Sequence, residues 1–315
     1  MNLRQLITHF EQWRSQRRRL ALAIVVATTG STYTKPDALM LLDEEGQYCG
    51  LLSGGCLEPD LAAHAAEVIA TATVKVVRYD MSERDDDELW GLGLGCDGTM
   101  SIMILPLSED NDYQPLARVA QLLSSQQACR LLLDVSSTRP AWVGVASDDD
   151  DEAVANMHTP HEPYTVTIAP PLRLLVLGAG RDAAPVVAAA QRLGWHVTVA
   201  DHRPVFLQQS AFQQADCRID SNEPLPLDNI DAAVVMSHHL GRDRLYLRAL
   251  ANSSAPYIGL LGPPARRERL LADIDADDDL RNRVRGPVGL DIGARDPESI
   301  AVSIVAEIYR DCLGS

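Results

Sequence analysis

The chain opens with apolar positions at helical spacing, followed by a continuous apolar run. Positions three and four apart form one helix face: Leu3, Leu6, Ile7, Phe10 and Trp13. The run LALAIVVA at 20–27 is far shorter than the roughly 20 apolar residues that a membrane helix needs. The pattern therefore predicts an amphipathic helix and then a buried strand at 20–28. We expect neither a membrane span nor a secretory leader.

The remaining residues up to 146 mix strand-like and helix-like segments. Helical spacing covers 58–71 and 113–126. Strands are predicted in ALAIVVATT, ALMLLDEEGQYCGLL, TVKVVRYD, MSIMILPL and CRLLLDV. We therefore predict an N-terminal α+β or α/β domain over 1–146, and the pattern leaves the order of its strands open.

The segment 147–171 has a different composition. It reads SDDDDEAVANMHTPHEPYTVTIAPP, with an acidic run, a polar stretch and a closing Pro-Pro pair. Such a composition is typical of a linker, and Tyr164–Ile168 is a candidate short strand within it. We predict that this segment connects two domains.

Strands and helices alternate over 172–315. Strands are predicted at 173–177, 196–201, 231–237 and 255–262, and helices at 183–193, 242–250 and 265–274. A last helix follows Asp296, which can cap it, and Pro297, which fits its first turn. The alternation predicts a Rossmann-like domain with a doubly wound parallel sheet, which places the chain in the α/β class.

Length, charge and cysteine usage narrow the class of protein. The 315 residues exceed one compact core, and 46% hydrophobic content suffices for two. The formal charge of −16 excludes an electrostatic nucleic-acid footprint. The six cysteines form no C-x-x-C pair, which argues against a disulfide framework and a structural zinc site. We expect a cytoplasmic protein that binds neither nucleic acid nor membranes.

The sequence GAGRDA at 178–183 lies between a predicted strand and a predicted helix. In a dinucleotide-binding turn, Gly178 permits the tight turn and Gly180 lets a diphosphate approach the backbone. Asp201, at the end of the next strand, would hold ribose hydroxyls, whereas Arg203 would face a phosphate, so NAD and NADP stay open. The alternative is a Rossmann fold whose glycines serve packing alone.

His238 directly follows the strand predicted at 231–237. It therefore lies at the carboxyl end of the sheet, where open α/β sheets bind ligands. His238 is a candidate acid, base or hydrogen-bonding contact, and a structural histidine is the alternative.

Two cysteines stand in glycine-rich loops. Cys56 belongs to LLSGGCLEPDL at 51–61, directly before the predicted helix, and Cys96 belongs to GLGLGCDG at 91–98. Backbone N–H groups or a helix N-terminus near a thiol favour the thiolate, which binds metals and sulfur. Cys56 is therefore a candidate functional residue, with a structural role as the alternative.

Six segments, taken together and in order, carry a family resemblance. They are GSTYTKPDALMLLDEEGQYCGLLSGGCLE, GLGLGCDG, LLVLGAGRDAAPVVAAAQRLGWHVTVADHRP, DAAVVMSHHLGRD, YIGLLGPPARRERL and VGLDIGARDPESIAVSIVAEI. They resemble the XdhC/CoxI family through nearly the whole chain. The Ser-Gly-Gly-Cys-Leu-Glu signature is the specific part, because Rossmann glycines occur in many families.

The resemblance implies a molybdenum-cofactor insertion chaperone and not an enzyme. Its cargo would be molybdopterin or molybdopterin cytosine dinucleotide. The implied partners are an apo molybdenum hydroxylase of the xanthine dehydrogenase or aldehyde oxidoreductase type, a cysteine desulfurase that helps install the terminal sulfido ligand, and a cofactor cytidylyltransferase. We also expect a homodimer.

The resemblance also assigns cofactor-binding positions. They are Ser53, Gly54, Gly55, Cys56 and Glu58 in the first motif, Gly95 and Cys96 in the second, and Gly178, Gly180, Asp201, His238 and Asp243 in the Rossmann domain. Cys56 is the candidate molybdenum contact, because a thiolate is compatible with a metal that is held by soft sulfur ligands.

Two positions depart from the family pattern. Asp37 and Asp97 stand where the family usually has glycine, so both loops gain a carboxylate and lose freedom at positive φ. A carboxylate beside Cys96 disfavours its thiolate, which ranks Cys56 first of the two cysteines.

The residues alone leave two other functions open. One is an NAD(P)-dependent oxidoreductase that uses the glycine turn, and the other is a scaffold that binds no ligand. The sequence offers no tyrosine–lysine or lysine–histidine constellation that would name a hydride-transfer acid, which weighs against the oxidoreductase.

Overall fold

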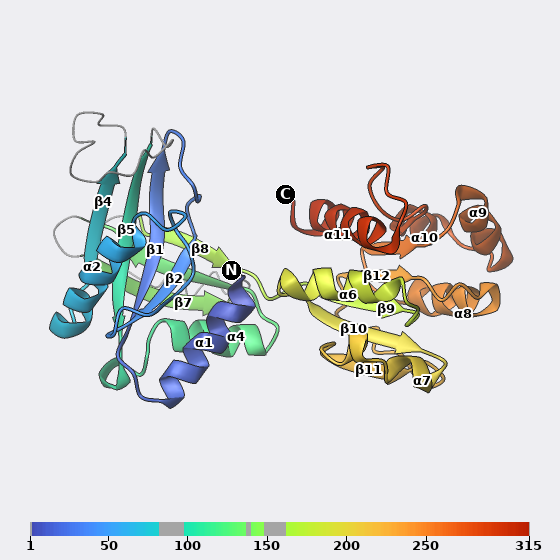
Figure 1. Ribbon diagram of the computed structural model, residues 1–315, viewed down its shortest axis with the longest axis horizontal. Coiled ribbons are helices and arrows are strands. Elements are labelled where there is room, and N and C mark those ends of the chain that lie inside the picture. The colour runs from blue at the N-terminus through green and yellow to red at the C-terminus, as the bar shows by residue number, and fades with distance from the viewer. Residues whose placement is uncertain (1, 82–97, 137–139, 148–161, 315) are drawn as a thin grey trace. The chain divides into compact units, whose positions relative to one another are not determined.

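The computed structural model describes residues 2–81, 98–136, 140–147 and 162–314 (Figure 1). The chain divides into two compact units, 1–170 and 171–315. Each unit has its own hydrophobic clusters. Within the described ranges, no helix has the length and apolar character needed to span a membrane.

The first unit contains two antiparallel sheets, with strand orders β3-β2-β1-β5-β4 and β7-β6-β8. The larger sheet consists of β1 (Leu20–Thr29), β2 (Leu39–Asp43), β3 (Tyr48–Cys49), β4 (Lys75–Asp80) and β5 (Thr99–Leu107). The smaller sheet consists of β6 (Cys129–Asp134), β7 (Ala141–Ser147) and β8 (Tyr164–Ile168). Among the described residues of this unit, the helical elements are α1 (Leu3–Ser15), α2 (Glu58–Thr71), α4 (Leu116–Ser124) and the 3-10 turn η2 (Glu109–Asn111).

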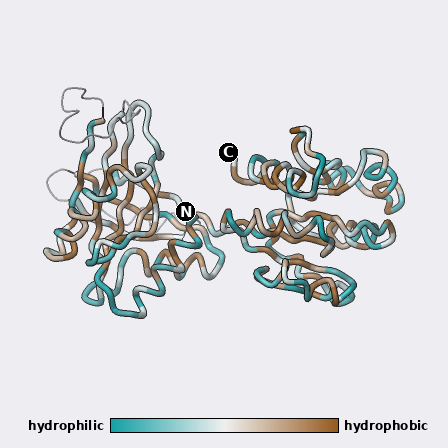
Figure 2. Tube along the Cα trace, in the orientation of Figure 1, coloured by the Kyte–Doolittle hydropathy of each residue, from teal (hydrophilic) through white to brown (hydrophobic). Residues whose placement is uncertain are grey.

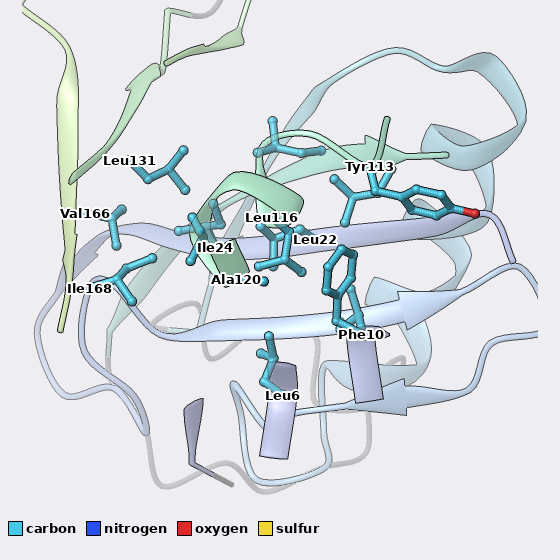
Figure 3. Close-up of a cluster of buried hydrophobic side chains, with 14 of the residues drawn as sticks. Leu6, Phe10, Leu22, Ile24, Tyr113, Leu116, Ala120, Leu131, Val166 and Ile168 are labelled. Carbon is cyan, nitrogen blue, oxygen red and sulfur yellow. The ribbon is translucent and has the colours of Figure 1, made fainter. Parts of the chain in front are cut away.

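Strand β1 is buried on both faces, which explains its continuous apolar run. Leu22 and Ile24 belong to a cluster with α1, α4 and the smaller sheet (Figure 3). Ala21 and Ala23 belong to the cluster on the opposite face, which includes α2. Successive side chains point to opposite faces of a strand, so this one segment contributes to both cores.

The second unit contains a six-stranded parallel sheet of order β11-β10-β9-β12-β13-β14. The strands are β9 (Arg173–Leu177), β10 (His196–Asp201), β11 (Cys217–Asp220), β12 (Ala232–Val235), β13 (Tyr257–Leu260) and β14 (Val284–Arg285). The helical elements are α6 (Ala183–Arg192), α7 (Pro204–Leu207), η3 (Ser210–Phe212), α8 (Leu240–Ala251), α9 (Pro264–Asp273), α10 (Asp278–Arg283) and α11 (Pro297–Leu313). One face of the sheet packs against α6 and α11, and the other against α8, α9 and α10. Figure 2 shows the apolar character of the strands that lie between these helices.

The direction of the strand order reverses between β9 and β12, which are neighbours in the sheet although β10 and β11 separate them in sequence. This order confirms the predicted Rossmann-like, doubly wound domain. Ligands of open α/β sheets bind outside the carboxyl ends of the strands at such a reversal. A ligand site of the second unit is therefore expected near the carboxyl ends of β9 and β12.

Several predicted elements have their predicted bounds. The helix over 58–71 and the strand over 196–201 are present as α2 and β10, and Asp296 caps α11 in a capping box. The strand predicted at Tyr164–Ile168 is present as β8 and pairs with β6, so this part of the predicted linker belongs to the smaller sheet. The apolar pattern does not predict β7, β11 or β14, which are short or partly exposed.

Candidate functional site

The Ser-Gly-Gly-Cys loop is closed by the carboxylate of Glu58. This carboxylate accepts backbone N–H groups from Leu52, Ser53 and Gly55, each at 2.9 Å, and the Ser53 hydroxyl at 2.5 Å. The Ser53 hydroxyl oxygen in turn accepts the Leu57 N–H at 2.7 Å. Two side chains thus fix the backbone on both sides of the double glycine.

Glu58 is buried, with 1% of its surface exposed. Burial alone would raise the pKa of its carboxyl, but the hydrogen bonds from Ser53 and Leu52 outweigh burial and hold this pKa below its ordinary value. Its oxygens are already occupied by groups of the chain. Glu58 therefore acts as a positioning residue for the loop, a role that the sequence motif did not reveal.

The loop leaves a small set of groups for a ligand. Gly54 and Gly55 have φ of +79° and +111°, a region that favours glycine. The backbone N–H groups of Gly54 and Cys56 donate to no group within the described residues. Cys56 is partly exposed and lies two positions before the first residue of α2. These two N–H groups and this thiol are the binding groups that the loop presents.

Thr34 connects the segment after β1 to this loop, whereas Gly98 packs against the end of β1. Thr34, after β1, donates its hydroxyl to the Leu52 carbonyl at 2.8 Å. A Cβ atom at Gly98 would lie 2.4 Å from the Thr29 carbonyl oxygen, so only glycine fits at the start of β5. Gly98 is the last residue of the second glycine motif, whereas the predicted site residues Gly95 and Cys96, like Asp97, lie outside the described residues.

Asp37, where the sequence resemblance implies glycine, has a φ of 73°. Its carboxylate accepts the Tyr164 hydroxyl of β8 at 2.6 Å. Burial and this acceptor both raise the pKa of Tyr164. The carboxylate at Asp37 thus ties the loop after β1 to the smaller sheet.

In the second unit, the glycine turn approaches the end of β12 closely. Gly178 has a φ of +127°, and a Cβ atom there would lie 2.6 Å from the Met236 carbonyl oxygen. A Cβ atom at Gly180 would lie 2.5 Å from Oδ1 of Asp182. Gly178 therefore serves close packing at the reversal of strand order, and Gly180 faces a carboxylate of its own turn.

Asp201 is buried beside the same turn. Its Oδ2 accepts the Ala179 N–H at 2.7 Å and Nη2 of Arg203 at 2.9 Å, and its Oδ1 accepts Nε of Arg203 at 2.9 Å. Burial would raise the pKa of Asp201, but the bonds from Arg203 and Ala179 lower it. A ribose at this carboxylate would have to displace Arg203.

His238 lies at the carboxyl end of β12 and pairs with the turn. Its Nε2 lies 2.7 Å from Oδ2 of Asp182, and its own φ is 59°. The His238 side chain is 61% exposed. His238 and Asp182 thus form an accessible pair directly at the reversal of strand order.

Asp243 lies in the first turn of α8, which follows His239. Its carboxylate accepts the Ser237 hydroxyl at 2.5 Å and Nη2 of Arg266 at 2.6 Å. Asp243 is buried on α8 and connects the residue after Met236, at the end of β12, to α9. This arrangement gives Asp243 a structural task beside the glycine turn.

The residues assigned by motif thus fall into two groups. Ser53, Gly54, Gly55, Cys56 and Glu58 form one loop in the first unit, and Gly178, Gly180, Asp201 and His238 surround the glycine turn of the second. Across the described residues, no group of three or more His, Cys, Asp and Glu side chains is arranged to hold a metal ion.

The chain that carries these loops is similar to a named protein over nearly its whole length. The chain is 33% identical over 309 residues to a Bacillus subtilis protein named as a probable subunit of xanthine dehydrogenase, and the match covers 92% of each chain. Residues 13–80 match the XdhC and CoxI family, and residues 174–308 match the XdhC Rossmann domain. The chain belongs to the XdhC and CoxI family.

Two further proteins are similar to this chain over most of its length. The "Molybdenum cofactor insertion chaperone PaoD" of Escherichia coli is 24% identical over 91% of this chain and 81% of its own length. The crystal structure of a protein named as a xanthine dehydrogenase from Bacillus halodurans has a TM-score of 0.84 and 32% identity, covering 98% of this chain and 95% of that one. The family match at 13–80 contains the Cys56 loop, and the match at 174–308 contains the glycine turn.

The sequence analysis did not single out Asp182, which lies in the glycine turn of the second unit. The signal is present in GAGRDA, where an acidic residue stands two positions after Gly180. A carboxylate there opposes the charge of a bound diphosphate, whereas the free N–H groups of a helix start attract it. Asp182 is therefore a residue that can control which anions this turn accepts.

Proposed function

We propose that this chain is a molybdenum-cofactor insertion chaperone for an enzyme of the xanthine dehydrogenase type, which binds and transfers the cofactor without turning it over. The observation that carries the proposal is the closed loop over 52–58, which leaves two N–H groups and the Cys56 thiol for a ligand. The relative named as a molybdenum cofactor insertion chaperone supports this function.

The groups of the loop fit the chemistry of this cargo. Molybdenum in the cofactor is held by soft dithiolene sulfur, with which a protein thiolate is compatible. Backbone N–H groups of a glycine loop bind anions such as phosphates. The Cys56 thiolate would therefore be a temporary contact of the metal centre, while the N–H groups of Gly54 and Cys56 orient the anionic part of the cargo.

Two features of the second unit weigh against an NAD(P)-dependent oxidoreductase. Both carboxylate oxygens of Asp201 accept from Arg203, so they are not open to ribose hydroxyls. Asp182 places a carboxylate beside Gly180, where a diphosphate would approach. The proposed cargo is molybdopterin or its cytosine dinucleotide. Measuring the affinity of the protein for each form shows which one it prefers.

The proposal also covers the protein's partners and its cellular location. In this proposal, the protein is a cytoplasmic homodimer that receives the dinucleotide form of the cofactor from a cytidylyltransferase. It shields the sulfurated cofactor after a cysteine desulfurase has acted. It then delivers the cofactor to an apo molybdenum hydroxylase. A formal charge of −16 repels an anionic cargo at long range. Cargo capture therefore depends on contacts at the loop, and delivery on direct docking with the partner enzyme.

The test compares Cys56→Ser with Cys217→Ser, which removes an exposed thiol of the second unit. Molybdopterin binding by the purified protein is measured without oxygen, together with maturation of an apo xanthine dehydrogenase. Cys56→Ser should weaken binding at least tenfold or stop maturation, and Cys217→Ser should leave both unchanged. Maturation by Cys56→Ser at the wild-type rate would make Cys56 structural. A wild-type protein that binds NAD(H) but no molybdopterin would favour the oxidoreductase.

A further inference from the structure

Tyr33 presents an aromatic ring beside the double glycine. Its side chain is 59% exposed, and a Cβ atom at Gly54 would lie 3.4 Å from its Cδ2 and Cε2 atoms. A Cβ atom at Gly55 would meet no atom within 4 Å. The ring therefore stands against one glycine, while the space over the next is open.

The segment 31–36, which we call the Tyr33 loop, is held by contacts that do not involve the Tyr33 ring. The Thr32 hydroxyl donates to the Thr34 carbonyl at 2.7 Å, and the Thr34 hydroxyl donates to the Leu52 carbonyl at 2.8 Å. Gly98 packs closely against the carbonyl oxygen of Ser31. Because the threonine hydroxyls and Gly98 already hold the loop, the exposed ring is not needed for this, and it is preorganised for a ligand.

The Tyr33 loop also carries a cation. Lys35 is exposed and is one of only two lysines in the sequence. The other, Lys75, lies 2.6 Å from Glu67 and 3.1 Å from His64. Within the described residues Lys35 has no ion-pair partner. On a chain of formal charge −16, an exposed cation next to Thr34, which contacts Leu52, offers local attraction to an anionic ligand.

We propose that the Tyr33 loop is one wall of the cargo site, with the Tyr33 ring stacking on the flat heterocycle of the cargo and Lys35 pairing with its phosphate. This inference rests on the proposed function and names two binding residues that the motif does not assign. An aromatic ring stacks on any planar heterocycle, so the contact suits the pterin ring system. A cation beside it suits a phosphate group, which the N–H groups of Gly54 and Cys56 also favour.

The first test asks whether an aromatic ring at position 33 is needed for cargo binding, or whether an apolar side chain there suffices. Molybdopterin affinity is measured without oxygen for wild type, Tyr33→Phe, Tyr33→Leu and Tyr309→Ala, the last removing a 50% exposed tyrosine of the second unit. Tyr33→Phe and Tyr309→Ala should bind within twofold of wild type, whereas Tyr33→Leu should bind about tenfold more weakly. Thermal unfolding of each variant checks that it folds.

The second test uses the scarcity of lysines. An amine-reactive reagent labels the wild-type protein with and without molybdopterin, and mass spectrometry reads labelling at Lys35 and Lys75. Bound cargo should protect Lys35 at least threefold and leave Lys75 unchanged as the internal control. Wild-type affinity in Tyr33→Leu, or equal labelling of Lys35 in both samples, would overturn the inference and leave the proposed function intact. A wild-type protein that binds no molybdopterin would overturn both.

Discussion

Glu58 holds Ser53 twice, through its backbone N–H at 2.9 Å and its hydroxyl at 2.5 Å. The Ser53 hydroxyl oxygen also accepts the Leu57 N–H at 2.7 Å. Two adjacent glycines would otherwise make the loop costly to order, because glycine loses the most backbone freedom on folding. The acid and the serine of the motif thus maintain one shape of the backbone, and the cysteine between them is presented from that shape.

Replacing Glu58 with Gln should destabilise the first unit. The amide keeps one acceptor oxygen and places an NH₂ group against backbone donors, so buried N–H groups lose their partners. We expect the free energy of unfolding to fall by about 2–4 kcal/mol. Urea unfolding followed by tryptophan fluorescence measures this difference. The exposed Glu11→Gln in α1 is the control and should change it by less than about 0.5 kcal/mol. An equal effect of the two variants would contradict the positioning role of Glu58.

The stability that Glu58 provides should depend on pH. Its pKa is lowered in the folded protein, so the charged form contributes stability above the pKa of the unfolded chain, about 4.3. That contribution is lost as the pH falls through the lower pKa of the folded state. The difference in unfolding free energy between wild type and Glu58→Gln should therefore be constant between about pH 7 and 5 and shrink in more acidic solution. A difference that grows on acidification would contradict the lowered pKa.

Arg203 should matter for stability through Asp201. Arg203→Ala leaves a buried carboxylate with the Ala179 and residue 203 N–H groups as its remaining donors. Because Arg203 is itself partly exposed, we expect a loss of about 1–3 kcal/mol in the second unit. Urea unfolding measures it, with the exposed Arg269→Ala as the control. A loss no larger than that of the control would mean that Asp201 does not need the guanidinium.

The sequence predicts much of the fold and only part of the site, for reasons that particular residues show. The bounds of α2 and β10 follow from local periodicity, which their packing in the fold does not alter. The pairing of β8 with β6 joins segments far apart in sequence, which local spacing cannot reveal. The motif points to Glu58 as a member of the site. Its role follows only from the turn of the loop that brings three N–H groups onto one carboxylate.

Removing the charge of Asp182 should change which anions the glycine turn accepts. Asp182→Asn keeps the size of the side chain but removes the negative charge beside Gly180. We expect affinity for a soluble diphosphate, with cytidine diphosphate as the probe, to rise about threefold to tenfold at low salt. Calorimetry measures this, with the exposed Asp291→Asn as the control. Unchanged affinity in Asp182→Asn would contradict a role of this carboxylate in excluding anions.

Asp37 and Tyr164 offer a test of how an aspartate is tolerated at a position with positive φ. The backbone at Asp37 has a φ of 73°, which is unfavourable for aspartate, and the Tyr164 hydroxyl bond at 2.6 Å offsets that cost. Tyr164→Phe alone should lower the unfolding free energy by about 1 kcal/mol. Asp37→Gly should be nearly neutral in wild type, because the relief of strain and the lost bond compensate. In the Tyr164→Phe background it should stabilise by about 0.5–1 kcal/mol, because only the relief remains. A double-mutant cycle by urea unfolding measures the coupling energy between Asp37 and Tyr164, which we expect to be about 1 kcal/mol. A coupling near zero would mean that the loop after β1 keeps its form without Tyr164.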